Sequence, residues 1–215
     1  MPVGGTIRLK HGIHEIQEPI VVTKNVTILG DQENPDLVIL QGGEKNVFHL
    51  KSGFAKIVGV TVKNEGKEGC SSADNDAIQF SAPLGVLRKC VFMSRYGSGI
   101  TVNAKGSNPS VTSCTARDCG LSGFNIGSGA SGIFHDCTVS GNARAGMWVQ
   151  DVWSNPTVEG CTFENNQECG VRVNCFASGT FRRNKLSNTK NWEIKSWFIF
   201  VGKKKVIREY NTPNE

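Results

Sequence analysis

The sequence predicts an all-β fold, a right-handed parallel β-helix of the single-stranded β-solenoid type, with about eight rungs of 23–24 residues. Three observations predict it. A cysteine slot recurs at a fixed period, a glycine-containing strand pattern recurs at the same period, and the apolar residues lack helical spacing.

The first marker is a cysteine that follows an apolar residue by three positions. Cys90, Cys114, Cys137 and Cys161 are separated by 24, 23 and 24 residues, and Asn184 occupies the next slot, 23 residues further on. A narrow coil interior stacks identical small side chains, so these thiols are expected to be buried and reduced. The other four cysteines form no CxxC pair and have no histidines at zinc spacing. We therefore expect neither a metal site nor a cofactor.

The second marker, Gly-apolar-x-apolar, moves in step with the first. It reads GITV from Gly99, GFNI from Gly123, GMWV from Gly146 and GVRV from Gly170. Apolar residues within each unit lie two or three apart, and turn formers separate the segments, which predicts short strands with alternate side chains inward. Such units bury their apolar faces by stacking in parallel about 4.8 Å apart.

The whole chain fits a single β-helix domain. Its expected parts are N-terminal rungs over 1–45, regular rungs over 46–191, an inserted loop near 64–75, and a C-terminal cap with a basic tail over 192–215. In the regular part, Ile57 and Val60 occupy the apolar and cysteine slots of an earlier rung. Open strand edges at the ends of such a rod would permit end-to-end self-association.

A leucine-rich repeat is the competing fold, because VEGCTFENN loosely matches its strand consensus and the period is allowed. That fold needs a convex side rich in leucine. The chain has nine leucines, and the other half of each unit consists of Gly, Ser, Asn and a further strand.

The net charge of +5 is unevenly distributed, with +7 in the last 45 residues and −2 in the first 170. A solvated basic end is the expected reading, polyanion binding there is a weaker third option, and a nucleic-acid partner is not expected. No apolar run reaches the length of a membrane span, so no membrane association is expected, and no signal peptide is visible. We therefore expect a cytoplasmic or nuclear protein.

Several motifs carry a resemblance to known repeats: SNPSVTSC, SNPTVEGC, SGTFRRNKLSN and the GMWV and GVRV strands, over roughly 77–191. They resemble the β-helix repeats of carbohydrate-binding proteins and sugar hydrolases, and are most similar to the β-helix domain of F-box-only proteins. No F-box segment is seen here, so ligase recruitment is not carried over. The resemblance implies a recognition rod.

Recognition by such a rod depends on its outward side chains. The x of the glycine strand forms an external column of His49, Gln79, Thr101, Asn125, Trp148, Arg172 and Lys195. Trp148 either stacks a sugar ring or anchors a peptide, with Trp153 nearby, or it packs under a neighbouring turn. We predict non-catalytic binding of a protein or glycan along this face. The predicted binding residues are His49, Gln79, Asn125, Trp148, Asp151, Arg172 and Asn174.

A polysaccharide-active enzyme is the alternative hypothesis. The segment ADNDAIQF resembles the Asn-Thr-Asp-Gly strand of polygalacturonases, which would make Asp76 an acidic catalytic residue. A lyase, hydrolase or epimerase could use Asp74 and Asp76, and a calcium-dependent lyase could use Arg95 as its base. Glycoside hydrolysis needs a second carboxylate about 5–10 Å away, but the slots stacked beyond Asp76 hold Ser98, Ser122, Ala145 and Cys169.

Turn residues that bond to the backbone are therefore the expected role of these aspartates, and no catalytic residue is assigned. Asn142, Asn165 and Asn188 are likewise expected in equivalent turns, bonded to backbone or to one another.

Overall fold

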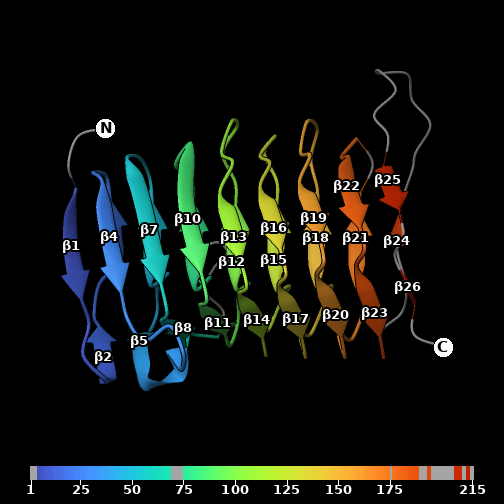
Figure 1. Cartoon of the computed structure of the whole chain (residues 1–215). Helices are drawn as coiled ribbons and strands as arrows, with labels where there is room; N and C mark the ends of the chain where they lie inside the picture. Colours follow the sequence, from blue (N-terminus) through green and yellow to red (C-terminus); the bar gives the residue numbers. More distant parts are fainter. Residues whose placement is uncertain are drawn as a thin grey trace.

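The structure, a computed structural model, describes residues 4–68, 75–174, 176–188, 193–194, 206–209 and 212–213. The chain winds into a right-handed parallel β-helix whose three sheets run along the rod (Figure 1). This confirms the predicted fold class. Within the described ranges, the single helical segment is the 3₁₀ turn η1, Pro35–Leu37, so the helical convex side of a leucine-rich repeat is absent there.

Three sheets of nine, nine and eight parallel strands form the sides of the rod. Sheet A contains β1 (Gly5–Arg8), β4 (Val26–Leu29), β7 (Phe54–Val58), β10 (Leu84–Arg88), β13 (Ser110–Thr112), β16 (Ile133–His135), β19 (Thr157–Glu159), β22 (Gly179–Arg182) and β25 (Val206–Glu209). Sheet B contains β2 (Gly12–Ile16), β5 (Val38–Gly42), β8 (Thr61–Asn64), β11 (Val91–Ser94), β14 (Thr115–Arg117), β17 (Thr138–Ser140), β20 (Thr162–Glu164), β23 (Lys185–Ser187) and β26 (Thr212–Pro213). Sheet C contains β3 (Ile20–Val22), β6 (Phe48–Leu50), β9 (Ile78–Phe80), β12 (Ile100–Val102), β15 (Phe124–Ile126), β18 (Met147–Val149), β21 (Val171–Val173) and β24 (Glu193–Ile194).

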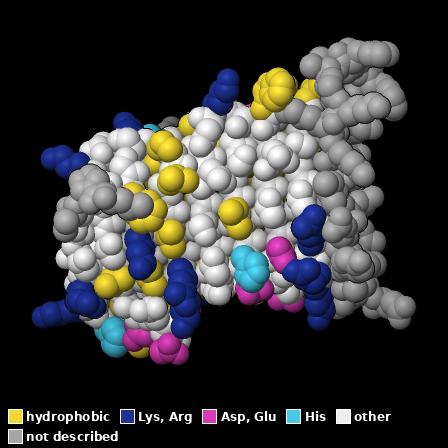
Figure 2. Space-filling model, turned by 45° about the horizontal axis from the view of Figure 1, so that its top comes forward, with side chains coloured by type: hydrophobic (Ala, Val, Ile, Leu, Met, Phe, Trp, Pro, Cys, Tyr) yellow, Lys and Arg dark blue, Asp and Glu magenta, His cyan; other side chains and the backbone are white. Residues whose placement is uncertain are grey.

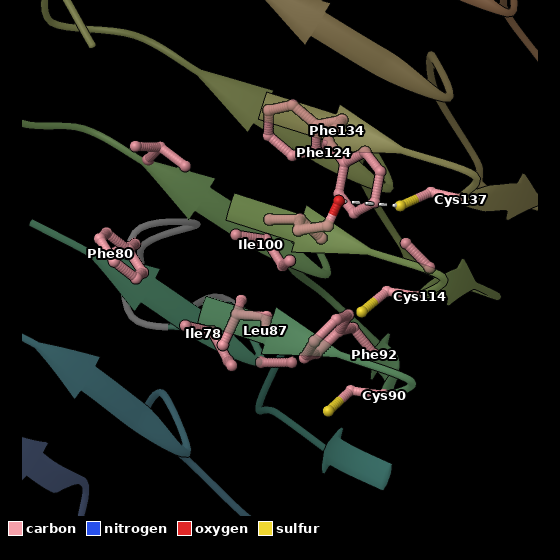
Figure 3. Packing of buried hydrophobic residues seen from close by; sticks show 14 of the residues in the cluster. Ile78, Phe80, Leu87, Cys90, Phe92, Ile100, Cys114, Phe124, Phe134 and Cys137 are labelled. Atoms are coloured by element: carbon pink, nitrogen blue, oxygen red, sulfur yellow. Dashed lines mark hydrogen bonds between the residues drawn. The ribbon is translucent and has the colours of Figure 1, made fainter. Parts of the chain in front are cut away.

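The core is a set of columns in which the same slot is filled rung after rung. Ile57 pairs with Leu87 and Leu87 with Val111, and all three side chains are fully buried, as the repeat predicts. Phenylalanines fill much of the remaining interior, including Phe124 and Phe134, whose ring centroids lie 4.9 Å apart (Figure 3). Because each rung alone leaves its apolar face open, stacking of the rungs is what forms the core.

The cysteine column lies inside the rod, where the period of the sequence places it (Figure 3). Cys90, Cys114, Cys137 and Cys161 are at most 1% exposed and are free thiols. The next slot holds Asn184, whose Oδ1 accepts the Cys161 N–H at 2.9 Å and so ends the column with a polar side chain. The expectation of buried, reduced thiols is confirmed for these four positions.

A column of buried asparagines runs along the corner between sheets B and C. Asn142 and Asn166 occupy equivalent positions on successive rungs, and Asn142 is fully buried. The expected equivalence of Asn142 with Asn165 and Asn188 is wrong by one residue. Asn165 and Asn188 instead share the left-handed conformation of Gly141, with φ of 54°, 47° and 66°.

The ends of the chain differ from the regular rungs. Strands β24, β25 and β26 add to sheets C, A and B, so the described parts of 192–215 extend the solenoid, although a cap departing from the repeat was expected. The rest of that cap, and residues 69–74 of the expected insertion over 64–75, lie outside the described residues. Among the helices of the described ranges, none is long and apolar enough to cross a membrane.

Candidate functional site

The outer face of sheet C carries two rows of side chains that run along the rod. The first row is the predicted column, since strand pairing aligns His49 with Gln79, Gln79 with Thr101, and so on to Arg172. On the next rung, strand pairing places Glu193 beside Arg172. The prediction of Lys195 as the last residue of the column is therefore wrong, and Lys195 lies outside the described residues.

A second row, which the sequence analysis missed, stands two residues further along each strand. Its backbone N–H groups each bond to the preceding rung. It consists of Lys51, Ser81, Asn103, Gly127, Gln150 and Asn174, of which only Asn174 was predicted. The period of two along a strand was the available signal, because side chains two apart share one face of a sheet.

Uncharged amides and hydroxyls dominate the middle of both rows. Several of them bond across rungs: Ser81 Oγ donates to Asn103 Oδ1 at 3.0 Å, and Gln150 Nε2 donates to Asn125 Oδ1 at 3.1 Å. These bonds use one donor or acceptor of each group, and an amide has two donors and an acceptor oxygen with two lone pairs. The rows therefore keep hydrogen-bonding capacity for a ligand.

Two buried polar atoms in the first row have no hydrogen-bond partner among the described residues. They are the hydroxyl Oγ1 of Thr101 and the indole Nε1 of Trp148, and Thr101 is only 7% exposed. A buried polar group without a partner costs free energy unless a ligand or water satisfies it. The first row thus has unmet bonding capacity on two of its rungs.

Trp148 and Arg172 interact on neighbouring strands, as predicted. The Arg172 guanidinium carbon lies 5.9 Å from the Trp148 ring centroid, which is cation–π geometry. Arg172 Nη1 also lies 2.7 Å from Glu168 Oε2, and its side chain is 17% exposed. Trp148 is half-buried, with the Arg172 guanidinium over its ring. The positive charge of Arg172 is balanced by the carboxylate of Glu168.

Asp151 holds a turn in place at the edge of sheet C. Its Oδ2 accepts the backbone N–H of Ser128 at 2.9 Å, on the preceding rung. Asp151 itself has a left-handed backbone, with φ of 66°. The carboxylate predicted to bind a ligand is thus engaged in joining two turns.

His49 stands at the N-terminal end of the first row, between Val21 and Gln79. Partial burial, helped by the charge of Lys51, lowers the pKa of the imidazole below its usual value of 6.5. The ring is therefore neutral at physiological pH and can both donate and accept one hydrogen bond.

The residues of the enzyme hypothesis do not form a carboxylate pair in the described ranges. Asp76 is 2% exposed, and its Oδ1 accepts the Ser98 N–H at 2.7 Å. Asp74 lies outside the described residues. Asp76 thus occupies the backbone-capping position expected of a structural turn aspartate.

Acidic side chains gather elsewhere, around a hollow of about 530 Å³ near the N-terminal end. Two of its glutamates form ion pairs with lysines: Glu18 with Lys45 at 2.7 Å, and Glu44 with Lys67 at 2.9 Å. No group of His, Cys, Asp or Glu in the described ranges has the arrangement to hold a metal ion.

Comparisons with known proteins agree with this architecture. A family profile described as "Right handed beta helix region" matches residues 45–204. No curated protein sequence matches the chain significantly.

Two solved structures share the fold at low sequence identity, and a third is more distant. The Agl-KA catalytic domain is 13% identical with a TM-score of 0.69, over 95% of this chain and 40% of its own. A protein described as Geobacillus virus E2 ORF18 is also 13% identical, with a TM-score of 0.52 over 99% of this chain and 52% of its own. The A-module of the Azotobacter vinelandii mannuronan C-5 epimerase AlgE4 is 12% identical, with a TM-score of 0.46 over 95% of this chain and 91% of its own. This chain thus spans about half or less of the first two. From its repeat, its three parallel sheets and the profile match, the chain belongs to the right-handed β-helix family.

Proposed function

We propose that this β-helix is a non-catalytic glycan-binding protein that holds an extended, uncharged polysaccharide chain along the outer face of sheet C. The observation that carries the proposal is the pair of side-chain rows. They present Gln79, Ser81, Thr101, Asn103, Asn125, Gln150 and Asn174 along one face of the rod.

The chemistry of the rows fits a polyhydroxylated ligand. Side-chain amides and hydroxyls both donate and accept hydrogen bonds, as sugar hydroxyls do. Each residue of the rows can therefore act as donor or acceptor toward the glycan. The resemblance of the repeats to those of carbohydrate-binding proteins supports the same class of ligand.

Charge argues against a polyanionic ligand on this face. Arg172 is paired with Glu168, which leaves His49 and Lys51 at one end as the other basic side chains of the rows. Binding to phosphates requires several unpaired cations and weakens steeply with salt. We therefore expect binding that changes little with ionic strength.

Native gel electrophoresis through gels cast with laminarin, galactomannan or hydroxyethyl cellulose tests the proposal, with polygalacturonate as the anionic comparison. The wild-type chain should be retarded by at least one neutral polymer. The double variant Asn125→Ala/Gln150→Ala removes two bonded amides of the rows and should weaken that binding about tenfold. Ser110→Ala/Thr112→Ala, two half-buried positions of β13 in sheet A, is the matched control and should bind normally.

Turnover assays on the same polymers separate binding from catalysis. Asp76→Asn keeps an oxygen that can accept the Ser98 N–H, so the variant should fold. Polymer cleavage or epimerisation by the wild type that disappears in this variant would overturn the non-catalytic proposal. Absence of retardation by every polymer would overturn the glycan proposal itself.

A further inference from the structure

The turns that follow sheet C form one edge of the rod, at the top of Figure 1, and four successive ones close in the same way. In each, the backbone N–H of the fourth residue bonds to the carbonyl of the first. The four bonds join Ser107 to Ala104, Ala130 to Gly127, Ser154 to Asp151, and Ala177 to Asn174, over 2.9, 3.0, 3.4 and 3.2 Å. The third residues of these turns are therefore structurally equivalent.

That third position has a left-handed backbone in all four turns. The residues are Gly106, Gly129, Trp153 and Phe176, with φ of 84°, 73°, 74° and 68°. Two rungs thus have glycine at this third position, which the left-handed conformation favours. The next two rungs have large aromatic side chains at the same position. A large side chain at positive φ is strained, so its presence needs a gain from elsewhere.

Both side chains nevertheless leave much of their surface open to solvent. Trp153 is 61% exposed and Phe176 is 41% exposed, beside Val152 at 43%. The position also opens to solvent, since a Cβ built at Gly106 meets nothing within 4 Å and one at Gly129 makes only ordinary contacts. In Figure 2, apolar side chains stand out from the upper edge of the surface.

The two aromatic residues adjoin the polar rows of sheet C on the same two rungs. Gln150 directly precedes the turn that carries Trp153, and Asn174 begins the turn that carries Phe176. Adjacent rungs of a parallel solenoid lie about 4.8 Å apart, so the two side chains emerge next to each other. Aromatic faces beside amides provide both apolar contact and hydrogen bonds to one ligand.

We infer that Trp153 and Phe176 form a platform on which a pyranose ring of the glycan stacks where the polymer crosses the edge of sheet C. The inference rests on the proposed function and adds the anchoring site. The apolar face of the sugar ring covers the exposed aromatic side chains, while its hydroxyls bond to Gln150 and Asn174. The strained turns are retained because they present these side chains to the ligand.

The test uses the full chain and the same polysaccharide gels, with Trp153→Gly and Phe176→Gly as the main variants. Glycine is the residue of the sister turns, so each variant should fold, with a melting temperature equal to or above that of the wild type. Each should bind the retarding polymer about tenfold more weakly, because one stacking surface is lost. Trp153→Phe keeps a stacking ring and should bind within about threefold of the wild type.

Ile133→Ala is the matched control, because it removes an apolar side chain of similar exposure (49%) from strand β16 of sheet A. It should not change binding. If Asn125→Ala/Gln150→Ala abolishes retardation while both glycine variants bind as the wild type does, the aromatic platform is contradicted. The two side-chain rows of sheet C would then be the glycan-binding site. A fall of several degrees in the melting temperature of Trp153→Gly would also overturn the inference, by showing that Trp153 serves packing.

A display library of short peptides tests whether the aromatic turns bind a protein instead of a glycan. Peptide capture that depends on Trp153, with no polysaccharide retarded, would overturn both proposals and make the aromatic turns a protein-binding site. Retardation that survives Asn125→Ala/Gln150→Ala but is lost in both glycine variants would keep the platform and overturn the rows.

Discussion

Asn142 and Asn166 are stacked one rung apart inside the rod, and Asn142 Nδ2 donates to Asn166 Oδ1 at 2.8 Å. The same Asn142 Nδ2 reaches the Ala116 carbonyl at 3.3 Å, and Asn142 Oδ1 accepts the Cys119 N–H at 3.1 Å. One buried side chain thus makes hydrogen bonds to two backbone groups of the preceding rung, near the corner where the chain turns from sheet B to sheet C.

Replacement of Asn142 by alanine should therefore destabilise the protein strongly. The Cys119 N–H would be left buried without its acceptor, which costs about 1–3 kcal/mol, and the bonds from Asn142 to the Ala116 carbonyl and to Asn166 would also be lost. We expect a loss of about 3 kcal/mol in the free energy of unfolding, measured by urea denaturation. Asn165→Gly, at an exposed neighbouring turn with φ of 54°, should be neutral or slightly stabilising. A small effect of Asn142→Ala would show that water replaces the amide.

The glycines that begin the sheet C strands are required by close approach of the next rung. A Cβ built at Gly146 lies 2.7 Å from the Gly170 carbonyl oxygen and 2.8 Å from Asn166 Nδ2. Gly146→Ala should therefore lower the free energy of unfolding by about 1–3 kcal/mol, since the neighbouring backbone must shift. Gly5→Ala is the control, because nothing lies within 4 Å of its Cβ, and its melting curve should match the wild type. Equal curves for both variants would mean that the rungs can separate at little cost.

Much of the fold could be predicted because the repeat reports on the interior. A slot that must be small and apolar on every rung leaves a period of 23–24 residues, and Cys90, Cys114, Cys137 and Cys161 show it. The asparagine column was misplaced by one residue because Asn165 and Asn166 are adjacent, and composition alone does not show which of them turns inward. The C-terminal strands were missed because 192–215 departs from the sequence period while continuing the sheets.

The candidate site was less predictable, because outward residues follow no period. The first row could be predicted from the x position of the Gly-apolar-x-apolar strand. Predicting the second row would have required continuing the inward–outward alternation of side chains one residue past the predicted end of that strand. The equivalence of Phe176 and Trp153 to Gly106 and Gly129 depends on turns that differ in length, so it needed the hydrogen bonds of the structure.

The six cysteines of the described ranges should resist modification in the native state. All six are buried, and burial raises the pKa of Cys119 to about 12 and also raises the pKa of Cys114. Because burial keeps the reagent away from all six sulfur atoms, Ellman's reagent at pH 8 should not react with them until the chain unfolds. The measurement uses a Cys70→Ser/Cys175→Ser variant, which removes the two remaining thiols. Rapid native reaction of any thiol in this variant would show that the cysteine column is open to solvent.

His49 should make the stability of the protein depend on pH in a defined window. Its pKa is lowered in the folded state, mainly by burial, so the unfolded chain takes up the proton first as the pH falls. Stability is therefore complete above the unfolded pKa of about 6.5, decreases as the pH drops below it, and levels off below the lower folded pKa. NMR titration should show a pKa below 6.5 for the His49 ring, whose signal is identified by its absence in His49→Gln. Denaturation curves of His49→Gln should change less than those of the wild type between pH 7 and pH 5, and identical pH dependence of the two proteins would contradict the burial of His49.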